Sequence, residues 1–436
     1  MDDRADAHSG LARRGIAAAS GCLGVASGMA HDRVRAYGSS GSEAAANPVE
    51  HRLDLARFGF PLTPDQLALR EAAEGFARAR VAPGAVERDR SREYPLTLVE
   101  ELGQMGLLAL KVAPEDGGAG ADNTGYALAM QAIAQACASV AVILASSNLV
   151  ANILDAHATP EQRERYLQPY ARGELGPAAF CLTEPGAGSD AAALRTTARP
   201  EGDTWVIDGA KHWITSGAHA GLFLVFARTG PEPGTRGVGC FVLERGTPGL
   251  EIGKDEGKMG LRSSGTVALH LDGCRVSDAA RLGSPGHGYA LALEALGAGR
   301  VGIAAQALGI AEAAFAEGVG YASARQAFGQ RVADFQASRF AIADSRADLD
   351  QAWLLTLRAA RLLDDGQRAA MEGSMAKLCA TEACGRVVDR MLQLHGGYGY
   401  SEDYAIERLY RDARITRIYE GTNEIQRLII AREILD

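Results

Sequence analysis

The spacing of hydrophobic and polar residues divides the chain into three stretches with different periods. From Thr63 onward, apolar residues recur at the spacing of an amphipathic helix. Thr63 followed by Pro64 has the form of an N-cap with proline in the first turn, and Pro83 is expected to end this first helix. Further helices are predicted over residues 96–107, 124–137, 141–156 and 160–172.

Near Gly176 the pattern changes to that of strands. Short runs of β-branched and aromatic residues are separated there by turn residues. Residues 204–215 predict a β-hairpin, with Asp208 and Gly209 forming a type I′ turn between two strands. With further strands expected over 222–227, 237–243 and 266–271, this stretch predicts a compact antiparallel barrel or sandwich.

From Gly286 the helical period returns and persists. A long helix is followed by two more over 335–363 and 371–394 and by shorter ones over 404–411 and 423–435. Long helices with short connections indicate a bundle. Helices and strands do not alternate, so a parallel-sheet nucleotide-binding domain is not expected. The predicted fold is a multi-domain α+β chain: an extension over 1–57, an N-terminal helical domain over 58–175, a middle antiparallel β domain over 176–283 and a C-terminal helical bundle over 284–436.

Composition excludes several classes of protein. The 436 residues are 47% hydrophobic and 23% charged, which is ordinary for a globular chain with a sizeable core. The formal net charge of −9 argues against a nucleic-acid binder. The interruptions in the apolar runs predict that none is long enough to cross a bilayer, so membrane insertion is not expected. The 7 cysteines are scattered and form no C-x-x-C pair, which favours a reducing compartment and predicts neither a disulfide framework nor a metal site.

The first 48 residues differ from the rest of the chain. They are rich in Ala, Gly and Ser and have little apolar periodicity, so a disordered extension is expected. Arg13 and Arg14 precede a diluted apolar run and faintly resemble an export signal, which is the alternative. The acidic residues Asp2, Asp3 and Asp6 argue against that signal, and a cytoplasmic location is expected.

Two segments of the middle stretch are candidates for ligand contact. The loop Cys181-Leu182-Thr183-Glu184-Pro185-Gly186-Ala187-Gly188-Ser189-Asp190 follows a predicted strand, and its glycines would let a ligand approach the backbone. It is neither a Walker loop nor a dinucleotide fingerprint, and a surface turn explains it equally well. The segment Trp213-Ile214-Thr215 offers an indole that could cover a flat ligand, or simply a core tryptophan.

Three further segments lie in the C-terminal stretch. Arg325-Gln326-Ala327-Phe328-Gly329 could bind a phosphate or could be a solvated helix end. Gln393-Leu394-His395-Gly396-Gly397 has more glycines than a helix C-cap requires. Thr422 can cap the last helix, with Glu424 in its first turn. That cap does not explain Glu420, a carboxylate between Tyr419 and Gly421.

Taken together and in this order, these motifs resemble the acyl-CoA dehydrogenase family. The resemblance covers about residues 63–434, and its most specific parts are T-E-P-G-A-G-S-D, W-I-T, R-x-x-F-G, Q-x-x-G-G and Y-R-D-A-R-I-x-x-I-Y-E-G-T-x-E-I-Q. The run Gly299-Arg300-Val301-Gly302 and the text after it look closest to short-chain, butyryl-type members. The resemblance implies the family's fold, with a helical domain, a β domain and a helical bundle.

The family resemblance implies an FAD cofactor shared between two subunits. Within one chain, the positions that match flavin contacts are Phe180, Leu182, Thr183, Gly188, Ser189, Trp213, Ile214 and Thr215. Positions matching contacts to a neighbouring subunit's FAD are Arg325, Phe328, Gln336, Gln393, Leu394, His395, Gly396 and Gly397. Thr422, Asn423 and Glu424 match residues beside the catalytic segment that also touch FAD. A homo-oligomer is implied, usually a tetramer built as a dimer of dimers.

By the same resemblance, Glu420 falls on the catalytic base, which takes the α-proton of an acyl thioester. Isovaleryl-type relatives carry the base at the position of Gly299, so this chain follows the majority arrangement. Positions matching acyl-CoA contacts are Ser189, Gly297, Ala298, Gly299, Arg300 and Gly421. The implied activity is α,β-dehydrogenation of an acyl-CoA, with electrons passed to an electron-transfer flavoprotein in a fatty-acid β-oxidation type of reaction. An acyl-CoA oxidase that uses oxygen and a non-catalytic protein on the same fold remain the alternatives.

Overall fold

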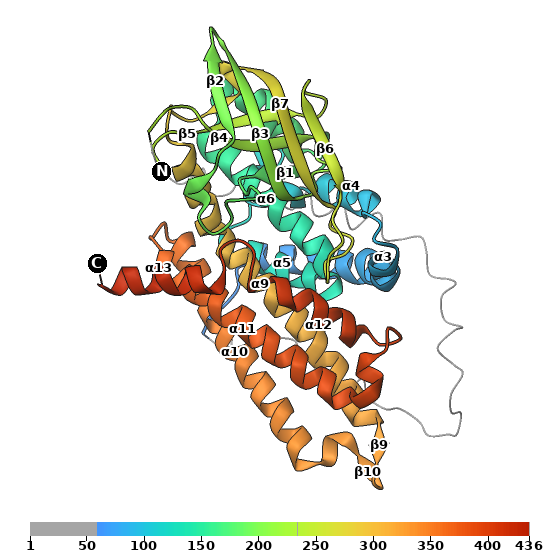
Figure 1. Cartoon of the computed structure of the whole chain (residues 1–436). Helices are drawn as coiled ribbons and strands as arrows, with labels where there is room; N and C mark the ends of the chain where they lie inside the picture. Colours follow the sequence, from blue (N-terminus) through green and yellow to red (C-terminus); the bar gives the residue numbers. More distant parts are fainter. Residues whose placement is uncertain (1–58, 233, 436) are drawn as a thin grey trace.

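The computed structural model describes residues 59–232 and 234–435 (Figure 1). The predicted extension over 1–57, the cysteine at position 22 and the expected start of the folded part near position 58 lie outside the described residues. In Figure 1 the β-sheet forms one end of the molecule and the C-terminal bundle the other, with the N-terminal helices between and beside them.

The first helix, α2, spans Pro64–Phe76 and begins at the predicted cap. The Thr63 hydroxyl accepts a hydrogen bond from the Gln66 backbone N–H at 3.2 Å, and the Gln66 side chain accepts one from the Thr63 N–H at 3.0 Å. The prediction that Pro83 ends this helix is wrong. The chain continues through a π turn at Ala77–Val81 and a 3-10 turn at Ala82–Gly84 into α3, Ala85–Ser91. Pro83 is tolerated because it lies in the first turn of a new short element, where its missing N–H is not needed.

The remaining N-terminal helices match the predicted segments within a few residues. They are α4 (Leu96–Gln104), α5 (Asn123–Ala136), α6 (Ala138–His157), α7 (Pro160–Gln162) and α8 (Gln168–Ala171), the last two joined by a π turn at Arg163–Leu167. Short 3-10 turns at Leu107–Ala109 and Pro114–Asp116 connect α4 to α5.

The middle part forms an eight-stranded sheet in the order β6-β7-β3-β2-β4-β5-β8, with β1 beside β4. Its strands are β1 (Ala178–Cys181), β2 (Thr197–Glu201), β3 (Thr204–Thr215), β4 (Leu222–Arg228), β5 (Val238–Glu244), β6 (Leu250–Asp255), β7 (Thr266–Ser277) and β8 (Arg281–Leu282). Most pairs are antiparallel, but β1 and β2 each run parallel to β4. The predicted strand segments are extended, and β2, β6 and β8 are additions that the sequence pattern did not indicate.

The predicted hairpin over residues 204–215 is wrong, because these residues form one continuous strand, β3. Asp208 and Gly209 lie within it, at a bulge where the pairing with β7 shifts register. Gly209 has φ +151°, and a Cβ there would lie 2.5 Å from the Thr196 hydroxyl oxygen. The glycine therefore permits a close approach of neighbouring backbone, not a chain reversal. The reversal occurs earlier, at Gly202 between β2 and β3.

The C-terminal part is the predicted helical bundle. Its elements are α9 (Gly288–Ala324), the small hairpin β9 (Gln326–Ala327) and β10 (Gln330–Arg331), α10 (Gln336–Asp364), α11 (Ala370–His395), α12 (Ala405–Ile415) and α13 (Asn423–Leu435). Figure 1 shows α9 running from the sheet to the far end of the bundle, where β9 and β10 lie.

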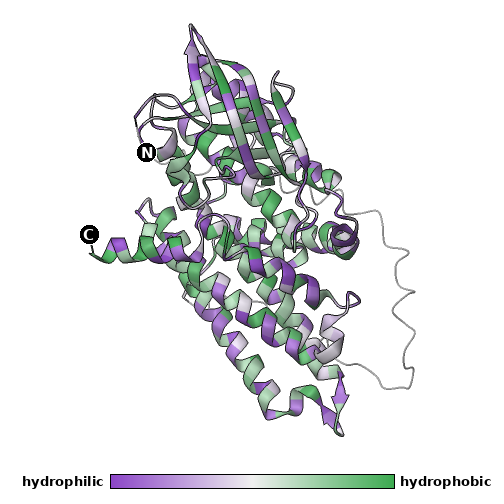
Figure 2. Cartoon of the chain, viewed as in Figure 1, coloured by the Kyte–Doolittle hydropathy of each residue, from purple (hydrophilic) through white to green (hydrophobic). Residues whose placement is uncertain are grey.

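Two helices, α6 and α9, are long and apolar enough to cross a membrane by length and composition alone. The prediction that no apolar run is long enough to cross a bilayer is therefore wrong by length and composition. Small residues such as Ser and Gly interrupt these runs but lower their mean hydropathy only slightly. Both helices are mostly buried within the protein, as core helices are. Figure 2 shows the hydrophobic residues concentrated where α5, α6 and α9 pack together, while the β9–β10 end is mostly hydrophilic.

Candidate active site

The glycine-rich loop after β1 is tied to the end of β3. The His212 backbone N–H donates to the Thr183 carbonyl at 2.9 Å. The ammonium of Lys211, a fully buried residue, donates to the Leu182 carbonyl at 3.2 Å and to the Glu184 carboxylate at 2.7 Å. Two segments that the sequence singled out separately are thus held side by side.

Glu184 fixes the far side of the same loop. Its carboxylate also accepts from the backbone N–H groups of Arg195 at 2.6 Å and Thr196 at 3.0 Å. Burial opposes ionisation, but Lys211 and these N–H donors together hold the pKa of Glu184 below its usual value. Burial in turn lowers the pKa of Lys211, against the attraction of Glu184. The buried Glu184–Lys211 ion pair, with its hydrogen bonds to the backbone, therefore favours one conformation of the loop.

The ring of Trp213 is left open to solvent beside this loop. The residue is 57% exposed at a left-handed backbone position with φ +61°, although its neighbour Ile214 is buried. Its indole stacks on the His212 ring, with centroids 4.8 Å apart and planes at 9°. A Cβ added at Gly186 or Gly188 would meet nothing within 4 Å. An exposed ring beside an open glycine loop is the surface that a flat aromatic ligand needs.

The other residues predicted on this side lie around that surface. Phe180, on β1, and Thr183 are half-buried, Leu182 is buried, and Ser189 is exposed at the end of the loop. Thr215, the last residue of β3, is half-buried. The structure therefore brings this predicted group together, from Phe180 to Thr215.

A second predicted group gathers at the β9–β10 end of the bundle. A hollow of about 510 Å³ there is lined by Tyr321, Arg325, Ala327, Val332, Gln393, Leu394, His395, Gly396, Gly397 and Tyr398. The Arg325 guanidinium lies 5.3 Å from the centroid of the Tyr398 ring. Gly396 adopts φ 58° with ψ −137°, which a residue with a side chain rarely does, and a Cβ on Gly396 or Gly397 would meet nothing within 4 Å. His395 is buried, and its Nε2 has no hydrogen-bond partner among the described residues.

Phe328 and Gln336 are not among the residues that line this hollow. Phe328, at φ +52°, is 97% exposed, and its ring packs edge-on against Phe335 with centroids 6.2 Å apart. Gln336 is exposed at the start of α10. An almost fully exposed phenylalanine at the tip of a hairpin is available for contact with another molecule.

Glu420 lies in the short segment between α12 and α13. It has φ +50° and is followed by Gly421 at φ +87°, so two successive residues adopt the left-handed region. Its carboxylate oxygen Oε2 is buried without a hydrogen-bond partner among the described residues. Burial raises the pKa of Glu420 to about 7, with nearby Lys377 acting in the opposite direction. Backbone strain together with a buried, unpaired carboxylate is typical of a functional group.

The walls around this carboxylate come from α5, α6 and α9. A Cβ added at Gly299, on α9, would lie 2.8 Å from Glu420 Oε2 and 2.9 Å from Leu149 Cδ2, on α6. Tyr126, on α5, is buried against Gly302, one turn further along α9. Burial and, to a lesser extent, the Glu420 charge raise the pKa of this phenol, which stays neutral. Gly299 therefore supplies the space that the carboxylate occupies.

The residues next to Gly299 differ in their surroundings. Gly297 is half-buried with open space at its Cβ position, and Ala298 is also half-buried. The Arg300 side chain donates from Nη1 to the Ala370 carbonyl at 3.3 Å, while its buried Nε has no partner in the part of the chain described. Burial lowers the pKa of Arg300 from its usual value. A partly buried guanidinium with an unused N–H can donate a hydrogen bond to a further polar partner.

The residues after Glu420 begin α13. The Thr422 hydroxyl accepts from the Ile425 N–H at 3.3 Å, which is the cap that the sequence predicted. Asn423 is buried and Glu424 is exposed. The sequence interpretation missed two buried lysines, Lys211 and Lys377, and the tyrosine Tyr126. The available signal for Lys377 was its place among small residues on the inner face of α11, where a lysine is unusual.

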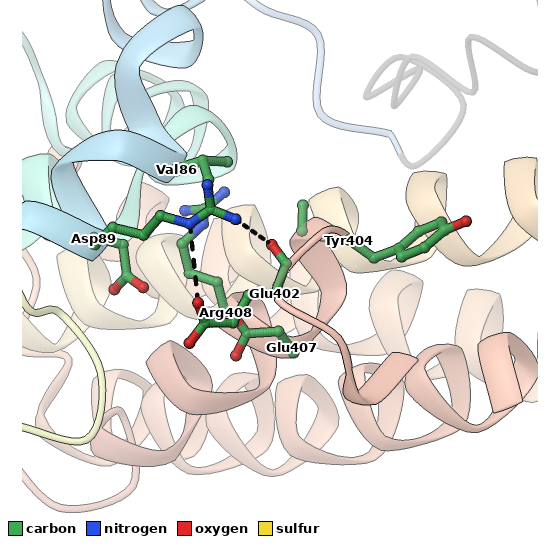
Figure 3. Close-up of a pocket in the computed structure, with 8 residues that line it drawn as sticks. Val86, Asp89, Glu402, Tyr404, Glu407 and Arg408 are labelled. Atoms are coloured by element: carbon green, nitrogen blue, oxygen red, sulfur yellow. Dashed lines mark hydrogen bonds and ion pairs between the residues drawn. The ribbon is translucent and has the colours of Figure 1, made fainter. Parts of the chain in front are cut away.

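Another hollow, between α3 and α12, is small and filled by polar contacts (Figure 3). Arg90 donates to the Glu402 carbonyl at 3.0 Å across it. Its volume of about 10 Å³ is at most that of one water molecule. This place carries no ligand site.

An open indole beside a glycine-rich loop offers a surface for a flat cofactor, and a carboxylate of raised pKa offers a base, which together fit an enzyme that removes a proton with the help of an aromatic cofactor. The chain belongs to the acyl-CoA dehydrogenase family. Its residues 63–174, 179–274 and 286–435 match the family's N-terminal, middle and C-terminal domains. The predicted family and fold are thereby confirmed, and the protein is an oxidoreductase that acts in acyl-CoA dehydrogenation with FAD as cofactor.

Similar proteins include the mitochondrial short-chain specific acyl-CoA dehydrogenase of Mus musculus, 42% identical over 84% of this chain and 89% of that protein. The 3-(aryl)acrylate reductase of Clostridium sporogenes is 43% identical over 84% of this chain and 97% of that protein. Among solved structures, butyryl-CoA dehydrogenase from Megasphaera elsdenii has a TM-score of 0.84 at 38% identity, covering 86% of this chain and all of that one. A chain from the structure of the electron transferring flavoprotein of Acidaminococcus fermentans also has a TM-score of 0.84 at 38% identity, over 86% and 99% of the two chains.

Proposed function

We propose that the protein converts a short-chain acyl-CoA to its trans-2-enoyl-CoA, with Glu420 as the base that removes the α-proton. The observation that carries this proposal is the Glu420 oxygen Oε2, which is buried and has no hydrogen-bond partner among the described residues, in a carboxyl group whose pKa burial raises to about 7. A base works best when its pKa is near the working pH, and a carboxylate at its ordinary pKa of about 4.3 is too weak. Similarity to short-chain and butyryl-CoA enzymes supports the substrate class.

The surface around Trp213 fits an FAD molecule, because the exposed indole lies beside glycines with free space next to them. When bound, FAD supplies the acceptor for the β-hydride. In the proposal, Trp213 covers one face of the isoalloxazine, Thr215 donates to its edge, and the segment from Phe180 to Ser189 lines its pyrimidine side. Thr422, Asn423 and Glu424 contact it beside the catalytic segment.

The remaining steps belong to this chain's own residues. Glu420 Oε2 takes the α-proton. The buried side chains of Leu149 and Tyr126 lie close by and keep water away from the carboxylate, and this burial keeps its pKa high enough to act as a base. The Glu420 backbone N–H is the proposed donor to the thioester oxygen, where it stabilises the developing enolate. Contacts to the acyl-CoA are assigned to Ser189, Gly297, Ala298, Gly299, Arg300 and Gly421.

A panel of straight and branched acyl-CoA substrates, assayed by reduction of an artificial dye, tests the proposal. Butyryl-CoA and its neighbours in length are expected to give the highest kcat/KM. Activity restricted to long or strongly branched substrates would overturn the assigned substrate class. The same panel, run with enoyl-CoA and a reductant, asks whether reduction of the double bond predominates, as the name of the Clostridium relative suggests for that protein.

The electron acceptor is proposed to be an electron-transfer flavoprotein. Support comes from the similarity to a chain in the structure of the Acidaminococcus electron transferring flavoprotein. An oxidase is the competing assignment, and oxygen consumption measured beside dye reduction distinguishes them. Substrate-dependent oxygen uptake as fast as dye reduction would favour the oxidase. Protein that purifies colourless and refuses FAD would favour a non-catalytic role.

The FAD site is proposed to be shared between subunits of a homo-oligomer, a tetramer built as a dimer of dimers. Arg325 directly precedes β9, and Figure 1 shows β9 and β10 at the end of the bundle that points away from the sheet, whereas Trp213 lies on β3 of that sheet. One chain therefore does not bring both predicted groups to one ligand, whereas two chains in a closed dimer can. Phe328 and Gln336 are proposed to contact the neighbouring subunit's cofactor, as are Arg325 and the Gln393–Gly397 segment.

Arg325→Ala is expected to weaken FAD binding and to loosen the dimer together. Gly397→Ala is a second variant, because a Cβ there meets no described atom within 4 Å and the fold should be kept. If a neighbour's FAD approaches this backbone, the added methyl should lower FAD occupancy. Flavin absorbance and sedimentation measured together check both variants, and a stable monomer that retains full FAD would contradict the shared site.

A cytoplasmic location and a dispensable extension over residues 1–47 are also proposed. CoA thioesters and the proposed flavoprotein partner are intracellular, so export would separate the enzyme from both. Deleting these residues is expected to leave FAD content and turnover unchanged. A cleaved, exported form found by fractionating the native host would contradict the first part, and loss of FAD in the truncated protein would contradict the second.

A further inference from the structure

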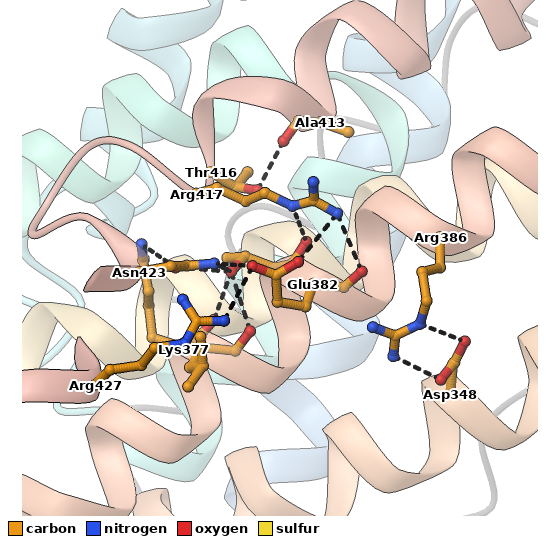
Figure 4. A network of polar contacts seen from close by, with 11 residues as sticks. Asp348, Lys377, Glu382, Arg386, Ala413, Thr416, Arg417, Asn423 and Arg427 are labelled. Atoms are coloured by element: carbon orange, nitrogen blue, oxygen red, sulfur yellow. Dashed lines mark hydrogen bonds and ion pairs between the residues drawn. The ribbon is translucent and has the colours of Figure 1, made fainter. Parts of the chain in front are cut away.

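Lys377 is a buried lysine that holds the segment containing Glu420. It lies on the inner face of α11 and is fully buried. Its ammonium donates to the Gly421 carbonyl at 2.9 Å and to the Asn423 side-chain oxygen at 2.9 Å (Figure 4). Neither of these partners is a carboxylate. Within the described part of the chain, the Lys377 ammonium therefore fixes the segment after Glu420 without a hydrogen bond to any carboxylate.

Asn423 is itself held from α11, which gives the contact one geometry. Its side-chain N–H groups donate to the Thr381 hydroxyl at 3.0 Å and to the Glu382 carboxylate at 2.8 Å. The Gly421 carbonyl accepts a second bond, from the Gln426 side chain at 3.0 Å. These contacts orient Asn423 so that its oxygen faces Lys377, and they hold the left-handed turn at residues 420 and 421.

Among the charged groups around Glu420, Lys377 has the largest effect on the pKa of the Glu420 carboxylate. Burial raises the pKa of Glu420 to about 7, and Lys377 is the charged group that opposes this rise. Burial lowers the pKa of Lys377 to about 8, and Glu420 is the first of the charges that oppose that fall. Other titratable groups facing the pair are, by element, Tyr126 of α5, Arg300 of α9, Glu382 of α11, Tyr419 of the connecting segment and Glu424 of α13.

We propose that Lys377 is a positioning residue for the dehydrogenation. Its ammonium holds the Gly421 carbonyl and the Asn423 side chain, so that Glu420 faces the space beside Gly299, and its positive charge keeps the Glu420 carboxylate ionised in the free enzyme. This inference rests on the proposed role of Glu420 as the base. Lys377 itself touches no substrate atom in the proposal.

Removing the positive charge of Lys377 is expected to change the pKa of Glu420 in a definite direction. A nearby cation favours the ionised carboxylate, so removing it raises the pKa of Glu420 above about 7. The acid limb of the pH profile of kcat/KM reports the free enzyme's base. It should therefore move to higher pH when the charge at position 377 is removed, and activity at neutral pH should fall.

The test uses FAD-loaded protein and the pH profile of kcat/KM with butyryl-CoA. Lys377→Met removes the charge and the hydrogen bonds, Lys377→Gln removes the charge and keeps an N–H donor on a shorter side chain, and Lys377→Arg keeps both the charge and the donors. Lys254, exposed on β6, provides the matched control as Lys254→Met. We expect an upward shift of the acid limb by about one pH unit or more in the Met and Gln variants. The Arg variant should stay close to wild type, and the control should not move.

The three Lys377 variants and Glu420→Gln separate the role of Lys377 from the role of Glu420. If the Met variant does not fold, the Gln and Arg pair still decides the question. An acid limb that stays in place in folded Gln or Met variants overturns the role of Lys377, even if their turnover falls. Failure of the proposed function is recognised differently, since Glu420→Gln would then keep its activity. A Lys377 shift is meaningful only beside an inactive Glu420→Gln variant, and that variant is measured in the same series.

Discussion

Glu420→Gln is expected to lower turnover by about 10²–10⁴-fold while leaving FAD content and the fold intact. Glutamine has nearly the same shape as glutamate but cannot accept the α-proton. The carboxylate makes no hydrogen bond through Oε2 within the described chain, so its replacement breaks no contact there. Steady-state turnover with butyryl-CoA, flavin absorbance and thermal melting together measure the effect.

A matched control is Glu251→Gln, the same chemical change at an exposed position on β6. It should retain wild-type turnover. Retention of a third or more of wild-type turnover by Glu420→Gln would refute Glu420 as the base.

Gly299→Ala is the second change with a large expected effect. The new Cβ would lie 2.8 Å from Glu420 Oε2 and 2.9 Å from Leu149 Cδ2, both ends of flexible side chains. The backbone should therefore tolerate the change while the carboxylate moves aside. Misplacing a reacting group by about 1 Å can cost about 10²-fold, and we expect turnover to fall by about 10–100-fold.

Gly320→Ala on the same helix serves as the control, because a Cβ there meets nothing within 4 Å. It should keep full activity and gain up to about 1 kcal/mol of stability from helix propensity. Turnover is measured with melting temperature, so that a stable Gly299→Ala protein of low activity can be told from an unfolded one. Equal activity of the two alanine variants would show that the Glu420 carboxylate does not need the space beside Gly299.

The sequence predicted helices best where the apolar period was long. The long helices α10 and α11 begin and end within one residue of the predicted ranges 335–363 and 371–394. Where the helix is short, a cap signal helped: the last helix spans the predicted residues 423–435, and the cap at Thr63 has the predicted hydrogen bonds. The prediction failed at Asp208 and Gly209, because this pair suits a tight turn as well as a bulge. The choice between the two depends on neighbouring strands that are distant in sequence.

The candidate site was predictable only through local motifs. Glu420 stood out because a helix cap at Thr422 left it unexplained. Its relation to Gly299 could be anticipated from family resemblance, but the short separation of their atoms depends on how α9 packs. Lys377 belongs to no motif, and the small residues around it in the sequence indicate only that it lies on the inner face of its helix. Its importance comes from the burial of its ammonium against the 421–423 segment, which only the tertiary structure reveals.

The backbone at Glu420 has a consequence for how this position is kept during evolution. A residue with a side chain pays roughly 1–2 kcal/mol to adopt the left-handed region, and a buried carboxylate without a partner lowers stability further. Selection for stability alone would therefore favour glycine or asparagine at residue 420. The glutamate persists only while selection for turnover outweighs that pressure. In a copy of the gene released from catalysis, this is the residue that drift should replace early.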